Sequence, residues 1–147
     1  MSWDGNLSLV FFSMAEVNVV EAKASPKVLL VEDEAALRFV TSEYLVDDGG
    51  FIVIEANSAD EAVDILESTD DIQCVFTDVR MPGRFDGLDL TRHVKDRYPD
   101  LPILMTSGNL QPSEMVAGVP FVVKPYDLQQ LSVTIREMIG RINPSAV

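Results

Sequence analysis

The chain has 147 residues, of which 47% are hydrophobic, so it has room for one domain with a real core and little room for a second. Its formal net charge of -13 argues against direct nucleic-acid binding, because a nucleic-acid surface needs a basic partner that replaces its counterions. No run of 18 or more apolar residues occurs, which excludes a membrane-spanning helix on length, and the expected partners are other proteins.

The beginning of the chain differs in composition from the rest and is predicted to be a flexible extension or a docking segment. It contains an apolar patch at residues 7–12 with no basic stretch before it, so a signal peptide is not expected. One interpretation takes Met14 as the natural start, with residues 1 to 13 as an extension, and the other takes the apolar patch as a docking segment or an extra strand. The predicted boundaries are residues 1-26 for the extension, 27-142 for the domain and 143-147 for a C-terminal tail.

From residue 27 onward, short apolar runs of high strand propensity alternate with helical patterns. The runs cover residues 28–31, 51–54, 72–78, 103–105 and 121–123. This alternation predicts an α/β fold with a doubly wound parallel sheet and right-handed crossovers. The single cysteine, Cys74, lies within the third run and is expected to be a buried thiol. One cysteine allows no intramolecular disulfide, which is compatible with a cytoplasmic location.

Helical spacing connects these runs. Residues 34–46 form the first predicted helix, with Leu37, Val40, Tyr44 and Leu45 at helical spacing. Two pairs have the form of capping boxes that open later helices, namely Ser58 with Glu61 and Asp127 with Gln130. Before the last strand, residues 112–115 leave the only room for a helix, so the fourth helix is expected to be shortened or irregular.

Several of the predicted strands end in polar residues. Glu32 and Asp33 follow the first run, Asp78 ends the third, Thr106 follows the fourth, and Lys124 follows the last. Because ligands bind outside the carboxyl ends of parallel strands, these side chains should gather at one edge of the sheet. Oxygen ligands without His or Cys favour a hard ion, and we interpret the acids as a Mg²⁺ site. A metal, an ammonium group and a hydroxyl around Asp78 suit phosphoryl transfer to that carboxylate.

Five segments in this order resemble the receiver domain of two-component response regulators. They are Val31-Glu32-Asp33-Glu34, Phe76-Thr77-Asp78-Val79-Arg80-Met81-Pro82-Gly83, Asp86-Gly87, Met105-Thr106-Ser107 and Val123-Lys124-Pro125. The resemblance spans roughly residues 27 to 141. It implies a flavodoxin-like, five-stranded parallel sheet in the order 2-1-3-4-5.

The resemblance also implies roles for the acidic positions. Asp78 corresponds to the phosphoacceptor, which takes its phosphoryl group from a histidine kinase or a histidine phosphotransfer protein. Asp33 corresponds to a direct Mg²⁺ ligand, and Glu32 to its acidic neighbour that acts through water. The backbone carbonyl of Arg80 corresponds to a further metal ligand.

The remaining matches belong to the switch and its surroundings. Thr106 corresponds to the switch hydroxyl, Lys124 to the lysine that pairs with the phosphoryl group, and Phe121 to the switch aromatic. The peptide bond between Lys124 and Pro125 corresponds to one that is cis in this family.

The sequence departs from the usual family pattern in three places. Residues 83–85 lengthen the loop after Asp78, and the segment between Thr106 and Lys124 is shorter than usual, which leaves the usual output surface in doubt. Arg80 places a cation two residues after the phosphoacceptor. It either pairs loosely with nearby acids on the surface or influences the lifetime of the phosphoryl group.

The leading hypothesis is a stand-alone receiver that switches its contacts with a downstream protein, and not an enzyme beyond slow autodephosphorylation. One alternative is a receiver-like interaction module that is never phosphorylated. The other is a Mg²⁺-dependent phosphatase, but such enzymes carry a second acid where this chain has Arg80. His93 is interpreted as a surface residue and not as a phosphorelay histidine. A homodimer could form through residues 7–12 or through the last helix.

Overall fold

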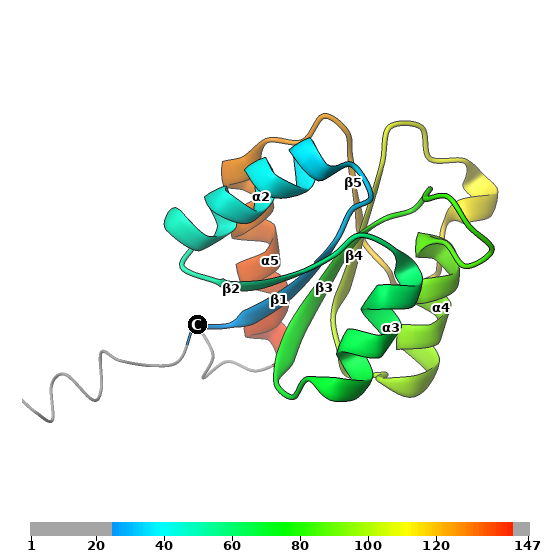
Figure 1. Cartoon of the computed structure of the whole chain (residues 1–147), viewed down its shortest axis with the longest axis horizontal. Helices are drawn as coiled ribbons and strands as arrows, with labels where there is room; N and C mark the ends of the chain where they lie inside the picture. Colours follow the sequence, from blue (N-terminus) through cyan, green and yellow to red (C-terminus); the bar gives the residue numbers. More distant parts are fainter. Residues whose placement is uncertain (1–24, 143–147) are drawn as a thin grey trace, which may run out of the picture.

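The computed structural model describes residues 25–142, and these form one parallel sheet with helices on both faces (Figure 1). The strand order is β2-β1-β3-β4-β5, as predicted. The strands are β1 (Lys27–Val31), β2 (Ile52–Ala56), β3 (Ile72–Asp78), β4 (Ile103–Ser107) and β5 (Phe121–Val123). The predictions for the apolar patch at residues 7–12 and for the tail at residues 143–147 lie outside the described residues.

Two helices cover each face of the sheet (Figure 1). The helices are α2 (Ala35–Asp47), α3 (Ala59–Ser68), α4 (Gly87–Arg97) and α5 (Leu128–Ile142). Successive strand residues point to opposite faces, so Phe76 packs with α2 and α5 while its neighbour Val75 packs with α3 and α4. Burial of each such side chain contributes about 1.5–3 kcal/mol. The core therefore consists of two apolar layers, one on each side of the sheet.

The connection between β4 and β5, residues 108–120, contains no full helix, as predicted. Its one helical turn is the 3₁₀ helix η1 (Pro112–Glu114). A proline starts this turn, and Gly118 with a φ of 79° and Pro120 end any continuation of it. The absence of a full helix between β4 and β5 therefore follows from the proline and glycine residues of this segment.

Helix α2 forms as predicted, but the helical spacing of its apolar residues does not identify its buried face. Val40 shares this spacing and is 51% exposed, and Phe39 beside it is 59% exposed. Thr41 is fully buried instead, and its hydroxyl lies 2.9 Å from the hydroxyl of Tyr126. Apolar residues lie on every side of this helix, so their spacing does not identify the buried face. The spacing of Val40 therefore indicates the helix and not the burial of this side chain.

The sequence interpretation began α4 one residue late, after Gly87, and did not identify Asp86 in the preceding loop as the N-cap of this helix. One carboxylate oxygen of Asp86 accepts from the amides of Leu88 and Asp89, both at 3.0 Å, and the Asp89 carboxylate accepts from the Asp86 amide at 3.0 Å. This is a capping box in which Asp replaces the usual Glu or Gln. A Cβ at Gly87 would lie 1.7 Å from the carbonyl oxygen of Asp78, so α4 packs directly on the end of β3.

The two capping boxes that were predicted are present in part. The Ser58 hydroxyl accepts from the Glu61 amide at 3.1 Å, but the Glu61 carboxylate accepts from the amide of Asn57 and not of Ser58. The Asp127 carboxylate accepts from the Gln130 amide at 2.8 Å.

No helix within residues 25–142 combines the length and the apolar character that crossing a membrane requires.

Candidate functional site

The polar residues that end the strands meet at one edge of the sheet, as predicted. Asp78 at the end of β3 pairs in register with Thr106 on β4. Glu32 and Asp33 directly follow β1, and Lys124 directly follows β5. The sheet therefore brings together residues that lie up to 92 positions apart in the chain.

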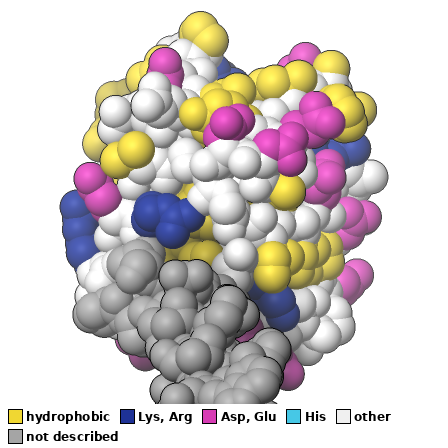
Figure 2. All heavy atoms as spheres, turned by 90° about the vertical axis from the view of Figure 1, so that its left-hand side faces the viewer, with side chains coloured by type: hydrophobic (Ala, Val, Ile, Leu, Met, Phe, Trp, Pro, Cys, Tyr) yellow, Lys and Arg dark blue, Asp and Glu magenta, His cyan; other side chains and the backbone are white. Residues whose placement is uncertain are grey.

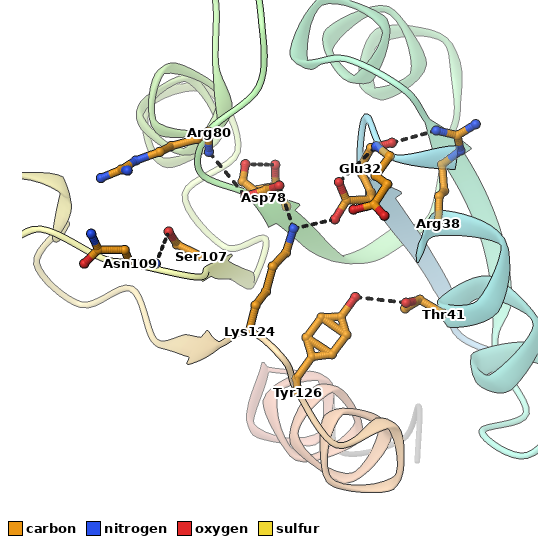
Figure 3. Close-up of polar contacts among 11 residues, drawn as sticks. Glu32, Arg38, Thr41, Asp78, Arg80, Ser107, Asn109, Lys124 and Tyr126 are labelled. Atoms are coloured by element: carbon orange, nitrogen blue, oxygen red, sulfur yellow. Dashed lines mark hydrogen bonds and ion pairs between the residues drawn. The ribbon is translucent and has the colours of Figure 1, made fainter. Parts of the chain in front are cut away.

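The ammonium group of Lys124 lies between two carboxylates (Figure 3). Its Nζ is 2.8 Å from Glu32 Oε1 and 2.8 Å from Asp78 Oδ2. The acid side chains are only 3% and 10% exposed, so a close cation is needed to stabilise their charges. Burial alone would lower the pKa of Lys124, but the hydrogen bonds to Asp78 and Glu32 outweigh it and raise that pKa above its ordinary value. The lysine is therefore charged throughout the physiological pH range.

Glu32 is the more deeply buried of these two acids. Burial raises its pKa above the ordinary value, although hydrogen bonds from Lys124 and from the Glu34 amide at 3.1 Å partly oppose this effect. The backbone carbonyl of Glu32 accepts from Arg38 Nη1 at 2.7 Å, which fixes the chain at this position. The acid is thus held in place from both sides.

Three carboxylates are close enough to share one cation. Ligand oxygens of Glu32, Asp33 and Asp78 all lie within 4.8 Å of one another, and Asp33 is exposed to solvent. With Lys124 as the only ammonium in contact with these acids among the described residues, the cluster has a formal charge of minus two. Hard oxygen ligands with an excess of two negative charges fit Mg²⁺.

Thr106 has a hydroxyl that is not satisfied within the described part of the chain. The residue is 2% exposed, and its Oγ1 is buried without a hydrogen-bond partner there. A buried polar group without a partner costs stability, so such a group is usually explained by a function or by an absent ligand. Since Thr106 is the register partner of Asp78, its hydroxyl is available to a group attached to that carboxylate.

Arg80 contributes to the site through its backbone and not through its guanidinium group. Its amide donates to Asp78 Oδ1 at 3.3 Å, whereas its side chain points away from Asp78 (Figure 3). The guanidinium pairs with Glu114 of η1, with Nε at 3.1 Å and Nη2 at 2.7 Å from the carboxylate oxygens. This pairing with an acid was one of the two interpretations left open above. The predicted role of the Arg80 carbonyl as a metal ligand stays a prediction.

Two further predicted positions lie on or after β5. The peptide bond between Lys124 and Pro125 is cis, as the resemblance implied. Phe121 is half-buried and pairs in register with Met105 of β4. Its role as a switch aromatic stays a prediction.

The sequence interpretation missed Tyr126 and misplaced His93. The Tyr126 ring packs edge-on against Phe76 at 5.3 Å between centroids, and its hydroxyl bonds to Thr41. Tyr126 follows Lys124 by two residues, but no sequence motif or spacing predicted its place beside the site. His93 is half-buried between the rings of Phe85 and Tyr98, so it is not the surface residue that was expected.

An apolar hollow of about 420 Å³ lies beside the site, between α2 and the start of α5. It is lined by Leu37, Val40, Lys124, Pro125, Tyr126 and Leu128. Figure 2 views the side of the molecule that carries α2 and α5, and it shows apolar and acidic side chains next to one another over the upper part. A neighbouring hollow that shares Val40 and Leu128 is lined by Glu43, Asp47 and Asp48, so acids lie next to the apolar hollow.

Comparison with known proteins gives one family. The model of the response regulator receiver domain matches residues 28–136. A chemotaxis protein CheY homolog from Campylobacter jejuni is 31% identical over 121 residues, which cover 78% of this chain and 92% of that protein. The sensor kinase CckA from Brucella abortus is 35% identical over 129 residues, which cover 82% of this chain but only 13% of the kinase.

Solved structures agree with this result. A response regulator receiver protein from Sinorhizobium medicae has a TM-score of 0.74 at 28% identity, over 81% of this chain and 98% of that chain. A CheY-like receiver domain protein from Methanospirillum hungatei has a TM-score of 0.76 over 83% of this chain and 99% of that one. Its identity is 21%, so it supports the fold alone.

Proposed function

The chain belongs to the response regulator receiver family, and we propose that it accepts a phosphoryl group on Asp78 and thereby switches its contacts with other proteins. One observation carries this proposal. The Asp78 carboxylate lies beside a charged lysine and within a cluster of three carboxylates whose oxygens lie within 4.8 Å of one another, and its register partner Thr106 has an unsatisfied hydroxyl. These groups are the ones that phosphoryl transfer requires.

The proposed reaction takes place at one oxygen of Asp78. This oxygen attacks the phosphorus atom of a phosphohistidine, the new O–P bond forms, and the N–P bond breaks with its electron pair remaining on the histidine nitrogen. Lys124 then pairs with the negative charge on the phosphoryl oxygens, and the Thr106 hydroxyl donates a hydrogen bond to one of them. The product is an acyl phosphate on the protein.

Glu32, Asp33 and Asp78 are the residues that would hold Mg²⁺. When bound, Mg²⁺ supplies positive charge that offsets the charge of the phosphoryl oxygens during transfer. The residues of this chain contribute the anionic ligands and keep them in place, since Arg38 fixes the backbone of Glu32 at 2.7 Å. We therefore expect phosphorylation to depend on Mg²⁺.

The phosphoryl donor is expected to be a sensor histidine kinase or a histidine phosphotransfer protein. The apolar hollow next to Lys124 supports this proposal, because a partner docked there would reach Asp78 directly. The neighbouring acids Glu43, Asp47 and Asp48 favour a partner whose contact surface is apolar in the centre and basic at the edge. A cytoplasmic location and a downstream protein target belong to the same proposal.

Intact-mass measurement tests this function. The full chain is incubated with acetyl phosphate and Mg²⁺, and we expect a gain of one phosphoryl group that disappears without Mg²⁺. The Asp78→Ala variant should gain nothing, while Asp96→Ala, which removes an exposed acid of α4, should behave like the wild type. Circular dichroism confirms that each variant is folded.

The result also separates the alternatives. A folded wild type that gains no phosphoryl group from acetyl phosphate or from a phosphorylated kinase would contradict the proposal and favour a module that is never phosphorylated. Release of phosphate from small phosphomonoesters with repeated turnover would instead indicate a phosphatase. Phosphatases of this kind carry a second acid where this chain has Arg80, whose guanidinium pairs with Glu114.

A further inference from the structure

The ion pair between Arg80 and Glu114 joins two loops on the site side of the sheet. Arg80 lies two residues after Asp78, and Glu114 lies in η1 of the β4–β5 connection. Both carboxylate oxygens accept from the guanidinium, and Oε1 also accepts from the Gln111 amide at 2.9 Å. The hydrogen bond from Arg80 and the one from Gln111 lower the pKa of Glu114, so this carboxylate is ionised near neutral pH.

This ion pair is the polar link that holds the middle of the β4–β5 connection. Within the part of the chain that the structure describes, the other hydrogen bonds of residues 110–119 are local, such as those from Glu114 to Gln111 and from Met115 to Pro112. Apolar packing anchors the connection near its end, where Val119 contacts the core beneath α3 and α4. Without the ion pair, the turn at η1 would have no polar tie to the loop after Asp78.

The position of Arg80 allows it to exchange this partner for a group bound to Asp78. Its amide nitrogen is 3.3 Å from Asp78 Oδ1, so its side chain begins next to that carboxylate. The Arg80 side chain is 52% exposed and the Glu114 side chain 16%, so the ion pair is partly exposed to water, and a more highly charged acceptor can replace Glu114 as the partner of Arg80. A phosphoryl group offers oxygens that match the planar guanidinium in the same bidentate way as Glu114 does.

The charge of the site supplies the reason for such an exchange. Three carboxylates and one ammonium group give a formal charge of minus two, which Mg²⁺ would balance. Phosphorylation replaces the single charge of Asp78 with about two negative charges, and one negative charge is then in excess. Arg38, the other guanidinium near the acids, lies on the far side of Glu32 and is held by Glu55 at 3.2 Å (Figure 3). Of these two guanidinium groups, that of Arg80 is therefore the better placed to reach a phosphoryl group on Asp78.

We infer that phosphorylation of Asp78 moves Arg80 from Glu114 to the phosphoryl group and thereby releases the β4–β5 connection at η1. Glu114 is then a positioning residue, because it holds Arg80 away from the site until the phosphoryl group arrives. This inference rests on the proposed function, since it needs a phosphoryl group on Asp78. It makes the shortened connection a segment whose conformation reports the state of the site.

Amide and arginine Nε–H spectra of the ¹⁵N-labelled full chain test this inference, with Mg²⁺ and beryllofluoride as the phosphoryl mimic. In the wild type, the mimic should shift the Arg80 Nε–H signal and the amides of residues 111–115 together with those of Thr106 and Lys124. The Glu114→Gln variant keeps the acceptor for the Gln111 amide but loses the charge that holds Arg80. Its residues 111–115 should resemble the mimic-bound wild type before any mimic is added.

The same variant should also bind beryllofluoride more tightly, because Arg80 no longer has to leave an ion pair. The expected gain is about two- to fivefold, as is typical for loss of an ion pair that keeps contact with water. Glu43→Gln, which removes an exposed acid of α2, is the matched control and should leave the affinity unchanged. Arg80→Gln should weaken binding of the mimic.

The outcomes distinguish this inference from the proposed function. If the mimic shifts the signals of Thr106 and Lys124 but not those of Arg80 Nε–H and the amides of residues 111–115, the exchange is overturned and the phosphoacceptor role stands. An unchanged affinity in Glu114→Gln would also overturn it. If the mimic shifts no signal at all, including Thr106, both the proposed function and this inference fail.

Discussion

Replacing Lys124 with methionine tests whether this lysine stabilises the site by neutralising its acids. Methionine has a similar length but no charge, so Glu32 and Asp78 would lose hydrogen bonds of 2.8 Å each from the ammonium group. Breaking a buried ion pair by removing one partner costs about 3–5 kcal/mol. Because 21% of the lysine side chain is exposed, we expect the lower end, about 3 kcal/mol at neutral pH without Mg²⁺.

The loss of stability in Lys124→Met should depend on pH, and Glu32 determines whether this loss grows or shrinks as the pH rises. Burial raises the pKa of this acid above 4.5, so the folded state binds its proton more strongly than the unfolded state does. Stability from such a group falls as the pH rises above 4.5. Without Lys124 to oppose this effect, the deficit of the variant should be largest at neutral pH and should shrink as the pH is lowered toward 5. Mg²⁺ should recover part of it at neutral pH.

Urea unfolding followed by circular dichroism measures this effect. With a slope of about 2 kcal/mol per molar urea, a loss of about 3 kcal/mol lowers the midpoint by about 1.5 M. Lys95→Met, which removes an exposed lysine of α4, should change stability by no more than about 0.5 kcal/mol. A loss in Lys124→Met below about 1 kcal/mol, or one independent of both pH and Mg²⁺, would refute the electrostatic reasoning.

Three further changes have expected outcomes. Gly87→Ala should destabilise the fold by at least about 3 kcal/mol in urea unfolding, because its Cβ would overlap the carbonyl oxygen of Asp78 at 1.7 Å. Tyr126→Phe should cost about 1 kcal/mol, and a double-mutant cycle with Thr41→Val should show that both changes remove the same 2.9 Å hydrogen bond. Burial raises the pKa of the Cys74 thiol from 9.0 to about 12, so the unfolded state ionises first and stability falls above pH 9 by about 1.4 kcal/mol per pH unit. Cys74→Ala should remove this part of the pH dependence.

The centre of the site could be predicted from the sequence because its signals are local. Asp78, Thr106 and Lys124 each lie at the end of a predicted strand, and a parallel sheet brings such strand ends to one edge. The strand order, in contrast, came from the family resemblance, because the alternation of strands and helices is compatible with more than one order. The burial of Thr41 and the exposure of Val40 could not be predicted, since both faces of α2 carry apolar residues.

The side-chain pairs around the site depend on how loops fold, and no periodicity records this. Arg80 and Glu114 lie 34 positions apart, and Thr41 and Tyr126 lie 85 positions apart. Each residue alone resembles an ordinary surface or core position. The sequence did show that a cation follows Asp78 and that the β4–β5 connection is short, but only the structure shows that these two features contact each other.

The short connection also changes what holds the edge strand β5. Val122 packs toward α5, but its neighbours Phe121 and Val123 face the other side of the sheet. The β4–β5 connection has no full helix to cover them there, and Val123 is 58% exposed. A strand of three residues with one partly uncovered face gains less from packing than the buried central strands do. The ion pairs of Lys124, which directly follows β5, therefore contribute a larger share of what positions this strand. A change of charge at Asp78 consequently acts on the edge of the sheet as well as on the site.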